Sequence, residues 1–329
     1  MKSAFCTRLG IALPIIQAPL GGAAGPRLAA AVSNAGALGT LPLWGADVET
    51  VRKVVRETRA LTSKPFAVNL NMAFPQEQRL EACLEEGVPI ISFFWRDPSK
   101  LVARAKAGGA IVMHTVGTAR DARSAVDSGV DVVVAQGWEA GGHVRGTVAT
   151  LPLIPAVVDA VGDTPVVAAG GIADGRGMAA ALALGASGVW IGTRFLAAEE
   201  VLVHPEYQRR ILAASEDETN YCENLFDGGW PNAPHRVLRN STVIAWEAAG
   251  RPSSGARPGE GETVATSPSR GDIARYRSYT PGPDASGDIE ALSMWAGQSV
   301  ALVRKVQPAA EIVREIHADA VRTLARLNS

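Results

Sequence analysis

Residues Asp131–Gly137 read DVVVAQG. Four apolar residues in a row, three of them β-branched, are typical of a strand that is buried on both faces. The run ends in glutamine and glycine, and residues 138–143 continue as WEAGGH. An apolar strand followed directly by a polar, glycine-rich loop predicts a loop that binds or transforms a ligand.

The same pattern of a short apolar run that ends in glycine or a polar residue occurs eight times. The predicted strands are Pro14–Leu20, Ala37–Leu43, Pro65–Met72, Val88–Phe94, Ala110–Val116, Asp131–Gly137, Pro165–Gly171 and Gly188–Thr193. Alanine-rich amphipathic segments separate the strands. The predicted helices are Pro26–Ala35, Asp47–Leu61, Gln76–Glu86, Ser99–Ala107, Ala119–Ser128, Leu153–Val161 and Asp174–Leu184. Eight β–α units of similar length favour an α/β fold with a closed (β/α)8 TIM barrel over residues 1–200, rather than an open doubly wound sheet.

Beyond about residue 200 the β–α rhythm stops. We expect residues 201–288 to form an inserted, mainly helical lobe that covers the active site, with helices at Pro205–Ser215 and Thr242–Ala249. The Gly/Pro/Ser-rich stretch Gly250–Arg270 has the composition of a loop. Residues 289–329 are predicted to be helical and to pack back on the barrel. The lobe carries aromatic residues that are candidates for pocket walls or for simple packing, namely Tyr221, Phe226, Trp230, Tyr276 and Tyr279.

Composition limits the classes of partner. The formal net charge is -1, from 32 basic and 33 acidic residues, and no basic block is long enough to follow a nucleic-acid backbone. No stretch approaches the roughly 18 apolar residues of a membrane span. The three cysteines, Cys6, Cys83 and Cys222, have no paired spacing, which argues against a disulfide framework. We therefore expect a cytoplasmic enzyme without nucleic-acid or membrane partners, and a homodimer is compatible with the sequence.

In a parallel barrel the loops after the strands form the working face, so residues at the carboxyl ends of strands are the candidates for function. Gly170-Gly171 and Gly192-Thr193 lie at the carboxyl ends of the seventh and eighth predicted strands. Either pair alone is equally well explained by a tight turn, but backbone N–H groups placed together at these two strands favour a phosphate site. Arg176 and Arg194 lie near enough in sequence to assist. Dinucleotide and P-loop glycine motifs are absent from the chain, which disfavours those alternatives.

Other strand ends supply polar groups and one imidazole. Asn69 and Gln136 carry amides suited to the donor and acceptor edge of a flavin, and backbone at Gln17-Ala18-Pro19 can pack on its ring. Gly141 and Gly142 let the backbone approach a ligand and leave the His143 ring free to enter a cavity, although a lone histidine in such a turn is equally often structural. A phosphate cradle beside these groups suits flavin mononucleotide, FMN, with a substrate stacked on it.

Lysines and metal ligands are not placed for catalysis. None of the six lysines lies at the end of a predicted strand, which disfavours a Schiff-base enzyme. Acidic and histidine residues at the strand ends do not cluster at ligand spacing, so no metal site is predicted. His114 is expected to be a core residue or one that supports the site from behind; proximity to His143 on adjacent strands is the alternative. His235 falls beyond the barrel.

Together, several of these motifs resemble the nitronate monooxygenase family, formerly called 2-nitropropane dioxygenases. The motifs are Pro14–Gly22, Leu28–Asn34 with Ala35–Gly39, Val68–Leu70, Gln136–His143, Ala168–Gly175 and Gly192–Phe195. The resemblance covers the whole barrel, and residues 293–298 also look like a family feature near the cofactor.

The resemblance implies a non-covalent FMN held at Asn69, Gln136, Gly141, Gly171 and the segment Trp190-Ile191-Gly192-Thr193. It also implies that His143 is the active-site base. The activity implied is the oxidation of alkyl nitronates, and of nitroalkanes after loss of an α-proton, with O2 to carbonyl compounds and nitrite.

Two related classes share almost all of these motifs: FMN-dependent enoyl-acyl-carrier-protein reductases and FMN-dependent NADH:quinone reductases. Leu20 stands where the family often has Met, and Val144 separates His143 from Arg145-Gly146. The compact spacing of Asn69 and Gln136 looks more like the reductases. An NAD(P)H-dependent reductase is therefore the alternative function, and a non-catalytic flavin carrier is a third hypothesis.

Overall fold

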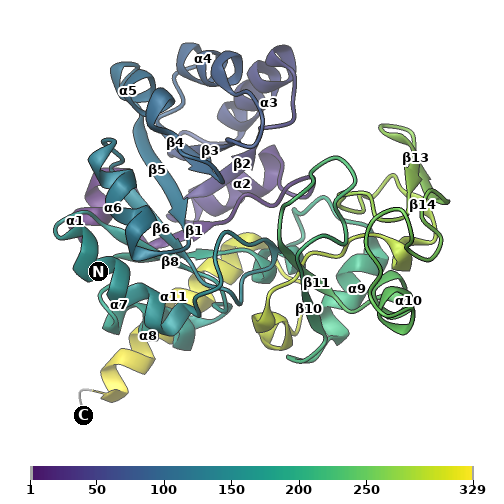
Figure 1. Ribbon diagram of the computed structural model, residues 1–329. Helices are drawn as coiled ribbons and strands as arrows, with labels where there is room; N and C mark the ends of the chain where they lie inside the picture. The colour runs from purple at the N-terminus through teal and green to yellow at the C-terminus, as the bar shows by residue number, and fades with distance from the viewer. Residues whose placement is uncertain (1–2, 328–329) are drawn as a thin grey trace.

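Eight parallel strands form the centre of the computed structural model, which describes residues 3–327 (Figure 1). The strands are β1 (Ile15–Gln17), β2 (Gly39–Pro42), β3 (Phe66–Asn71), β4 (Ile90–Phe94), β5 (Ile111–Val116), β6 (Val132–Gln136), β8 (Val166–Ala169) and β9 (Gly188–Ile191). Their order is β1-β9-β8-β6-β5-β4-β3-β2. A parallel bridge between Ile16 and Leu38 joins β1 to β2, so the sheet closes and the predicted TIM barrel is confirmed.

The seam between β1 and β2 is completed by a side chain. Gln17 is fully buried; its Oε1 accepts a hydrogen bond of 3.0 Å from Thr40 N, and its Nε2 donates 3.3 Å to Thr40 O. These two bonds replace ladder hydrogen bonds where the two strands diverge. Gln17 therefore serves barrel closure.

Seven helices alternate with the strands and cover the outside of the barrel. They are α2 (Pro26–Asn34), α3 (Val48–Leu61), α4 (Glu77–Glu85), α5 (Ser99–Ala107), α6 (Ala119–Asp127), α7 (Thr150–Val161) and α8 (Gly175–Ala183). The final helix, α11 (Ala309–Leu327), packs between α8 and α2. Among residues 3–327 no helix combines the length and the apolarity needed to cross a lipid bilayer.

A short helix that the sequence did not reveal, α1 (Ala4–Leu9), closes one end of the barrel. Phe5, Cys6 and Leu9 are buried against inward-facing residues of the strands. Ser3 caps the helix by accepting a hydrogen bond from Cys6 N, and Gly10 ends it in the left-handed conformation. Six residues are too few to show a helical period, so only packing on the barrel identifies this element.

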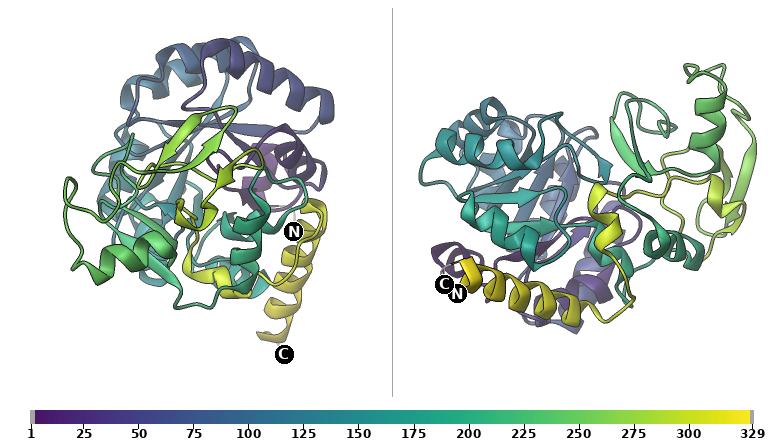
Figure 2. Two further views of the ribbon diagram at one scale, coloured as in Figure 1. Left: turned by 90° about the vertical axis from the view of Figure 1, so that its right-hand side faces the viewer. Right: turned by 90° about the horizontal axis from the view of Figure 1, so that it is seen from below.

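The segment after the barrel forms a lobe beside it (Figure 2). Its helices are α9 (Pro205–Ala213) and α10 (Ser241–Ala248), and its strands are β10 (Thr219–Cys222), β11 (His235–Leu238), β12 (Thr263–Ser267), β13 (Gly271–Ala274) and β14 (Ser286–Gly287). Three 3-10 turns, η1 (Thr193–Ala197), η2 (Ile289–Ala291) and η3 (Gln298–Leu302), connect the lobe to the barrel and to α11. The lobe is thus mixed rather than mainly helical, because short antiparallel strands are stabilised by distant partners that local sequence does not show.

One strand pair joins the lobe to the barrel. Strand β7 (Gly142–His143) lies in the loop after β6 and pairs antiparallel with β11, His143 opposite His235 and Gly142 opposite Arg236. Val144 N extends the contact by donating a hydrogen bond of 2.8 Å to Pro234 O. The histidine loop singled out by the sequence is therefore fixed by the lobe.

Helix α2 packs directly on the backbone of β2, which leads to a stability prediction. A Cβ atom at Gly39 would lie 2.1 Å from Ala29 O. We expect Gly39→Ala to destabilise the protein by about 1–3 kcal/mol because the helix must move away from the strand. Thermal denaturation checks this against Gly45→Ala, whose Cβ would meet no atom within 4 Å. Equal denaturation midpoints for the two variants would contradict the packing described.

Candidate functional site

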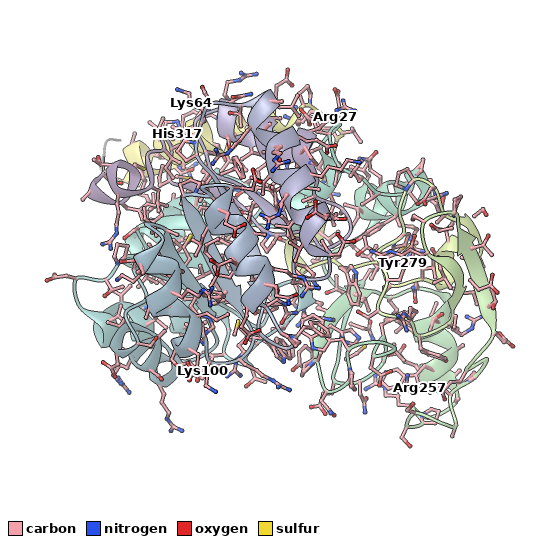
Figure 3. The ribbon with its side chains drawn as sticks, turned by 90° about the horizontal axis from the view of Figure 1, so that it is seen from above. Arg27, Lys64, Lys100, Arg257, Tyr279 and His317 are labelled. Atoms are coloured by element: carbon pink, nitrogen blue, oxygen red, sulfur yellow. The ribbon has the colours of Figure 1, made fainter. Side chains whose placement is uncertain are left out.

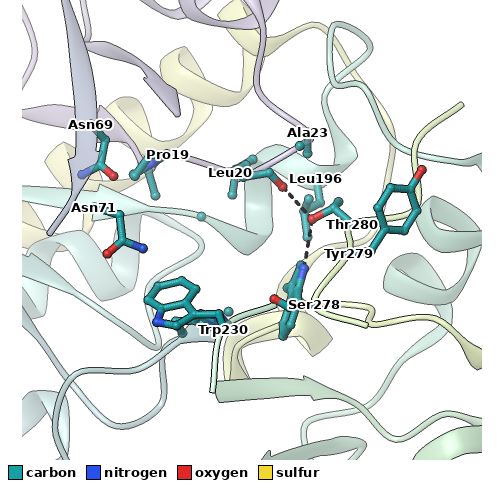
Figure 4. Close-up of a pocket in the computed structure, with 18 of the residues that line it drawn as sticks. Pro19, Leu20, Ala23, Asn69, Asn71, Leu196, Trp230, Ser278, Tyr279 and Thr280 are labelled. Atoms are coloured by element: carbon teal, nitrogen blue, oxygen red, sulfur yellow. Dashed lines mark hydrogen bonds between the residues drawn. The ribbon is translucent and has the colours of Figure 1, made fainter. Parts of the chain in front are cut away.

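A cavity of about 900 Å³ opens at the carboxyl ends of the barrel strands, where the lobe faces the barrel (Figure 4). Twelve of the predicted site residues line it: Ala18, Pro19, Asn69, Gln136, Gly141, Gly142, His143, Gly170, Gly171, Trp190, Gly192 and Thr193. Gln17 and Ile191 do not line it, because their side chains are buried in the barrel wall. The structure thus brings together residues that lie in β3, β6 and β9 or in the loops after β1, β6, β8 and β9.

The glycines after β8 and β9 form a cradle of bare backbone. Gly170 and Gly171 have φ values of 100° and 69°, which glycine adopts without strain. Within the described residues, no hydrogen bond occupies the N–H groups of Gly171 or Gly192. Thr193 Oγ1 accepts a hydrogen bond of 3.0 Å from Gly297 N. Two free N–H groups on neighbouring loops suit an anion such as a phosphate.

The two arginines expected to assist this cradle point elsewhere. Arg176 is exposed and bound to Asp174, its Nε 2.8 Å from Oδ2. Arg194 is buried, and its Nη2 donates 2.8 Å to Gln307 Oε1 in the segment before α11. Neither residue lines the cavity. A phosphate at the cradle would therefore be held by backbone donors.

The two predicted amides differ in their availability. Asn69 is buried, its Nδ2 donates 3.1 Å to Ser92 Oγ, and its Oδ1 is buried without a partner. Gln136 is already paired: its Nε2 donates 3.0 Å to His143 O, and its Oε1 accepts 2.8 Å from Arg145 N. Asn69 thus offers a free acceptor to a ligand, whereas Gln136 shapes the loop that carries His143.

Close backbone packing holds that loop. A Cβ at Gly141 would lie 2.3 Å from Gly297 N, so only glycine fits at this position. Glu139 accepts hydrogen bonds from Thr150 N at 2.9 Å and from Thr150 Oγ1 at 2.9 Å. The Glu139 carboxylate therefore caps the start of α7, where the helix dipole favours negative charge.

Aromatic rings enclose His143. Its ring centroid lies 3.7 Å from that of Trp230, 5.2 Å from Trp295 and 6.1 Å from Trp95. Nδ1 is buried and has no hydrogen-bond partner. The ring lines the cavity and is only half-buried, which leaves Nε2 as the nitrogen open to a ligand.

The surroundings of His143 keep it uncharged. Burial among the rings, with a smaller contribution from neighbouring His235, holds its pKa well below the usual 6.5. His235 is fully buried; its Nδ1 lies 2.9 Å from Ala233 O and its Nε2 accepts 3.2 Å from Phe226 N. Both His235 nitrogens are satisfied in the neutral tautomer, and burial lowers its pKa to about 4. His143 is therefore a neutral imidazole at neutral pH, able to accept a proton.

Arg236 secures the loop from the lobe side. Its guanidinium donates 3.0 Å to Trp138 O and lies 4.6 Å from the centre of the Trp138 ring and 5.8 Å from that of Tyr221. The side chain is 2% exposed, so both contacts act with little competition from water. No sequence motif indicated this role.

Several lining residues were not anticipated from the sequence. Asn71, Trp44, Phe74, Phe94 and Thr280 line the cavity. Trp95 has a φ of 88°, a strained conformation that is concentrated at functional sites. Of the five lobe aromatics, Trp230 and Tyr279 line the cavity, whereas Tyr221, Phe226 and Tyr276 do not. Figure 4 shows Thr280 bonded to the loop after β1.

No lysine lines the described cavity. Lys64 and Lys100 are exposed on the outer side of the barrel, remote from Tyr279 and Arg257 of the lobe (Figure 3). Within residues 3–327 no group of three or more His, Cys, Asp or Glu side chains is arranged to hold a metal ion. His114 is 6% exposed and bonded through Nδ1 to Phe93 O at 3.2 Å, so it is a core residue of β5.

Comparisons with known proteins identify relatives over the whole chain. The family model described as "Nitronate monooxygenase" matches residues 2–78 and 70–319. A dehydrogenase of an octahydro-indene-carboxyl-CoA from Mycobacterium tuberculosis is 42% identical over 246 residues, 74% of this chain and 68% of the relative. A nitronate monooxygenase from Paraburkholderia phytofirmans is 32% identical over 375 residues, 99% of this chain and 97% of the relative. The solved structure of FabK from Thermotoga maritima, 34% identical, superimposes with a TM-score of 0.86 and covers 100% of this chain and 99% of that one.

The buried histidines predict how stability depends on pH. Burial lowers the pKa of His114 and of His235 to about 4 and that of His143 well below 6.5, whereas an unfolded histidine titrates near 6.5. Below pH 6.5 the unfolded chain therefore binds more protons than the folded one. The contribution of the neutral histidines to the free energy of unfolding should be fully present above pH 6.5. It should fall toward pH 4, by up to about 1.4 kcal/mol per pH unit for each histidine.

Urea denaturation between pH 7.5 and 5 measures this slope. The amide of His114→Asn can donate to Phe93 O in place of the ring. This variant should reduce the slope of the free energy of unfolding against pH by the contribution of one histidine. A stability that rises as the pH falls, or an unchanged slope in the variant, would contradict the burial described.

Proposed function

Because the chain belongs to the nitronate monooxygenase family, whose members are FMN-dependent oxidoreductases, we propose that it oxidises alkyl nitronates with O2 to carbonyl compounds and nitrite. The observation that carries this proposal is the neutral His143 ring, whose Nε2 opens into the same cavity as the free N–H groups of Gly171 and Gly192. The N–H groups suit the phosphate of a flavin, and the imidazole suits a substrate that gives up a proton from carbon beside that flavin.

The residues present fit FMN. The N–H groups of Gly171 and Gly192 would hold its phosphate, and Asn69 Oδ1, buried without a partner, would accept a hydrogen bond from the flavin ring. Ala18 and Pro19 line the same cavity, and their backbone would pack on the flavin ring. When bound, FMN supplies the site with an acceptor for the electrons of the substrate.

The chain's own contribution to the reaction depends on the substrate. For a nitroalkane, His143 Nε2 would take the α-proton, and the enclosing Trp230 and Trp295 rings would exclude water from the proton transfer. For a nitronate, which has already lost this proton, His143 has no proton to remove. The cavity then serves to orient the anion.

A second candidate function is an FMN-dependent NAD(P)H reductase or dehydrogenase that acts on a thioester. Two observations support it: the M. tuberculosis relative is named for a carboxyl-CoA substrate, and Arg270 and Arg277, both exposed, line the cavity. No ion pair to either guanidinium occurs within the described part of the chain. Free cations at a cavity mouth suit the phosphates of a coenzyme or a nicotinamide nucleotide.

Anaerobic stopped-flow of the flavin-loaded protein separates the two functions. We expect propyl-2-nitronate to bleach the oxidised flavin band and NADH and NADPH to leave it unchanged, because the substrate itself is the electron donor in a nitronate monooxygenase. Rapid bleaching by NADH or NADPH alone would assign the protein to the reductases. A protein that binds no flavin would exclude both functions.

The role of His143 has its own test. His143→Asn should lower turnover of a neutral nitroalkane by about 10²–10⁴-fold, the usual contribution of a general base, and should change turnover of the corresponding nitronate little. The ratio of kcat/KM for 2-nitropropane to that for propyl-2-nitronate measures the difference. His114→Asn, a buried histidine outside the cavity, is the matched control. Equal losses on both substrates would exclude the base role.

A further inference from the structure

Asn71, at the last position of β3, carries a hydrogen-bond donor that the protein leaves unused. The residue lines the cavity and is 1% exposed. Its Oδ1 accepts a hydrogen bond of 2.9 Å from Ala73 N, whereas its Nδ2 is buried without a partner. Figure 4 shows Asn71 beside Asn69, with its amide nitrogen turned toward the open part of the cavity near Trp230. Buried donors are rarely left unpaired without a ligand to receive them.

The orientation of the Asn71 amide is fixed. Rotating it by 180° would place the NH2 group against Ala73 N–H and lose the existing bond. Gln76 holds the backbone in turn, because its Nε2 donates 2.9 Å to Asn71 O and 3.2 Å to Trp44 O. The free Nδ2 donor is therefore built into the cavity wall.

Asn71 lies two residues beyond Asn69, the proposed flavin acceptor, toward the carboxyl end of β3. Side chains two residues apart share a face and lie about 6–7 Å apart along a strand, so Asn71 lies nearer the mouth. Asn71 is in register with Phe94 of β4. The Phe94 ring lies 6.5 Å from that of Trp230, which contacts His143 at 3.7 Å.

We propose that Asn71 Nδ2 binds the oxygen on which negative charge develops in the substrate. Building on the proposed function, the proton leaves the α-carbon for His143 Nε2, and the electron pair of the broken C–H bond moves into the nitro group. One oxygen of the resulting nitronate accepts the hydrogen bond from Asn71. No oxidant is required for this step. The donor stabilises an anion more than a neutral nitro group, so it both binds nitronates and assists deprotonation.

The test compares Asn71→Asp and Asn71→Ala in the flavin-loaded protein. Asn71→Asp keeps an oxygen for Ala73 N–H and replaces only the donor that faces the cavity. Asn34→Asp, the same substitution at the exposed end of α2, controls for the added charge. Four quantities are measured: the Kd and the limiting rate for anaerobic reduction by propyl-2-nitronate, the Kd of nitrite from the flavin difference spectrum, and the affinity of the apoprotein for FMN.

We expect Asn71→Ala to raise the Kd of nitronate and of nitrite about tenfold and Asn71→Asp about 10–100-fold, with FMN affinity within twofold of the unsubstituted protein. Unchanged Kd values would overturn the proposal. A parallel loss of FMN affinity would also overturn it, by making Asn71 a flavin ligand. If nitronate fails to reduce the unsubstituted protein, the proposed function fails, and the nitrite titration still decides the role of Asn71.

Discussion

The antiparallel pairing of His143 with His235 is the interaction on which the site depends. It ties the loop after β6 to strand β11, about ninety residues later in the chain, and so makes the lobe part of the barrel's working face. Arg236, the neighbour of His235, contacts the same loop through a hydrogen bond to Trp138 O and a cation–π contact with the Trp138 ring. The flexible glycines of this loop are thereby held in one conformation, which orients the His143 imidazole as the proposed base role requires.

Enclosure by aromatic rings explains the chemistry of the imidazole. Trp230 and Trp295 come from the lobe and from the segment after η2, and Trp95 follows β4. Such surroundings disfavour the charged form of His143 and strengthen every hydrogen bond made within them. In the proposed function, the neutral His143 ring and the free amide donor of Asn71 would serve proton transfer, and the bare N–H groups of Gly171 and Gly192 would hold the phosphate.

The sequence predicted two kinds of feature: the repeated β–α units, and the backbone positions that require glycine. All eight barrel strands and two glycines of the cradle, Gly170 and Gly171, follow from local patterns, because buried parallel strands are continuously apolar and left-handed backbone selects glycine. Local patterns do not reveal which distant segments pair, so β7, β11 and the mixed character of the lobe emerge only in three dimensions. Local sequence also does not show where a side chain points. Gln17 bonds across the barrel seam, Arg194 bonds Gln307, and Asn71 faces the cavity, and no local pattern indicated these directions.

In the proposed function, flavin and His143 share the cavity between barrel and lobe. A crystal structure of the FMN-loaded protein tests this arrangement. We expect the phosphate within hydrogen-bond distance of Gly171 N and Gly192 N, and the flavin ring between Asn69 Oδ1 and the His143 imidazole. A phosphate bound instead at Arg194, or a His143 ring turned away from the flavin, would exclude this arrangement.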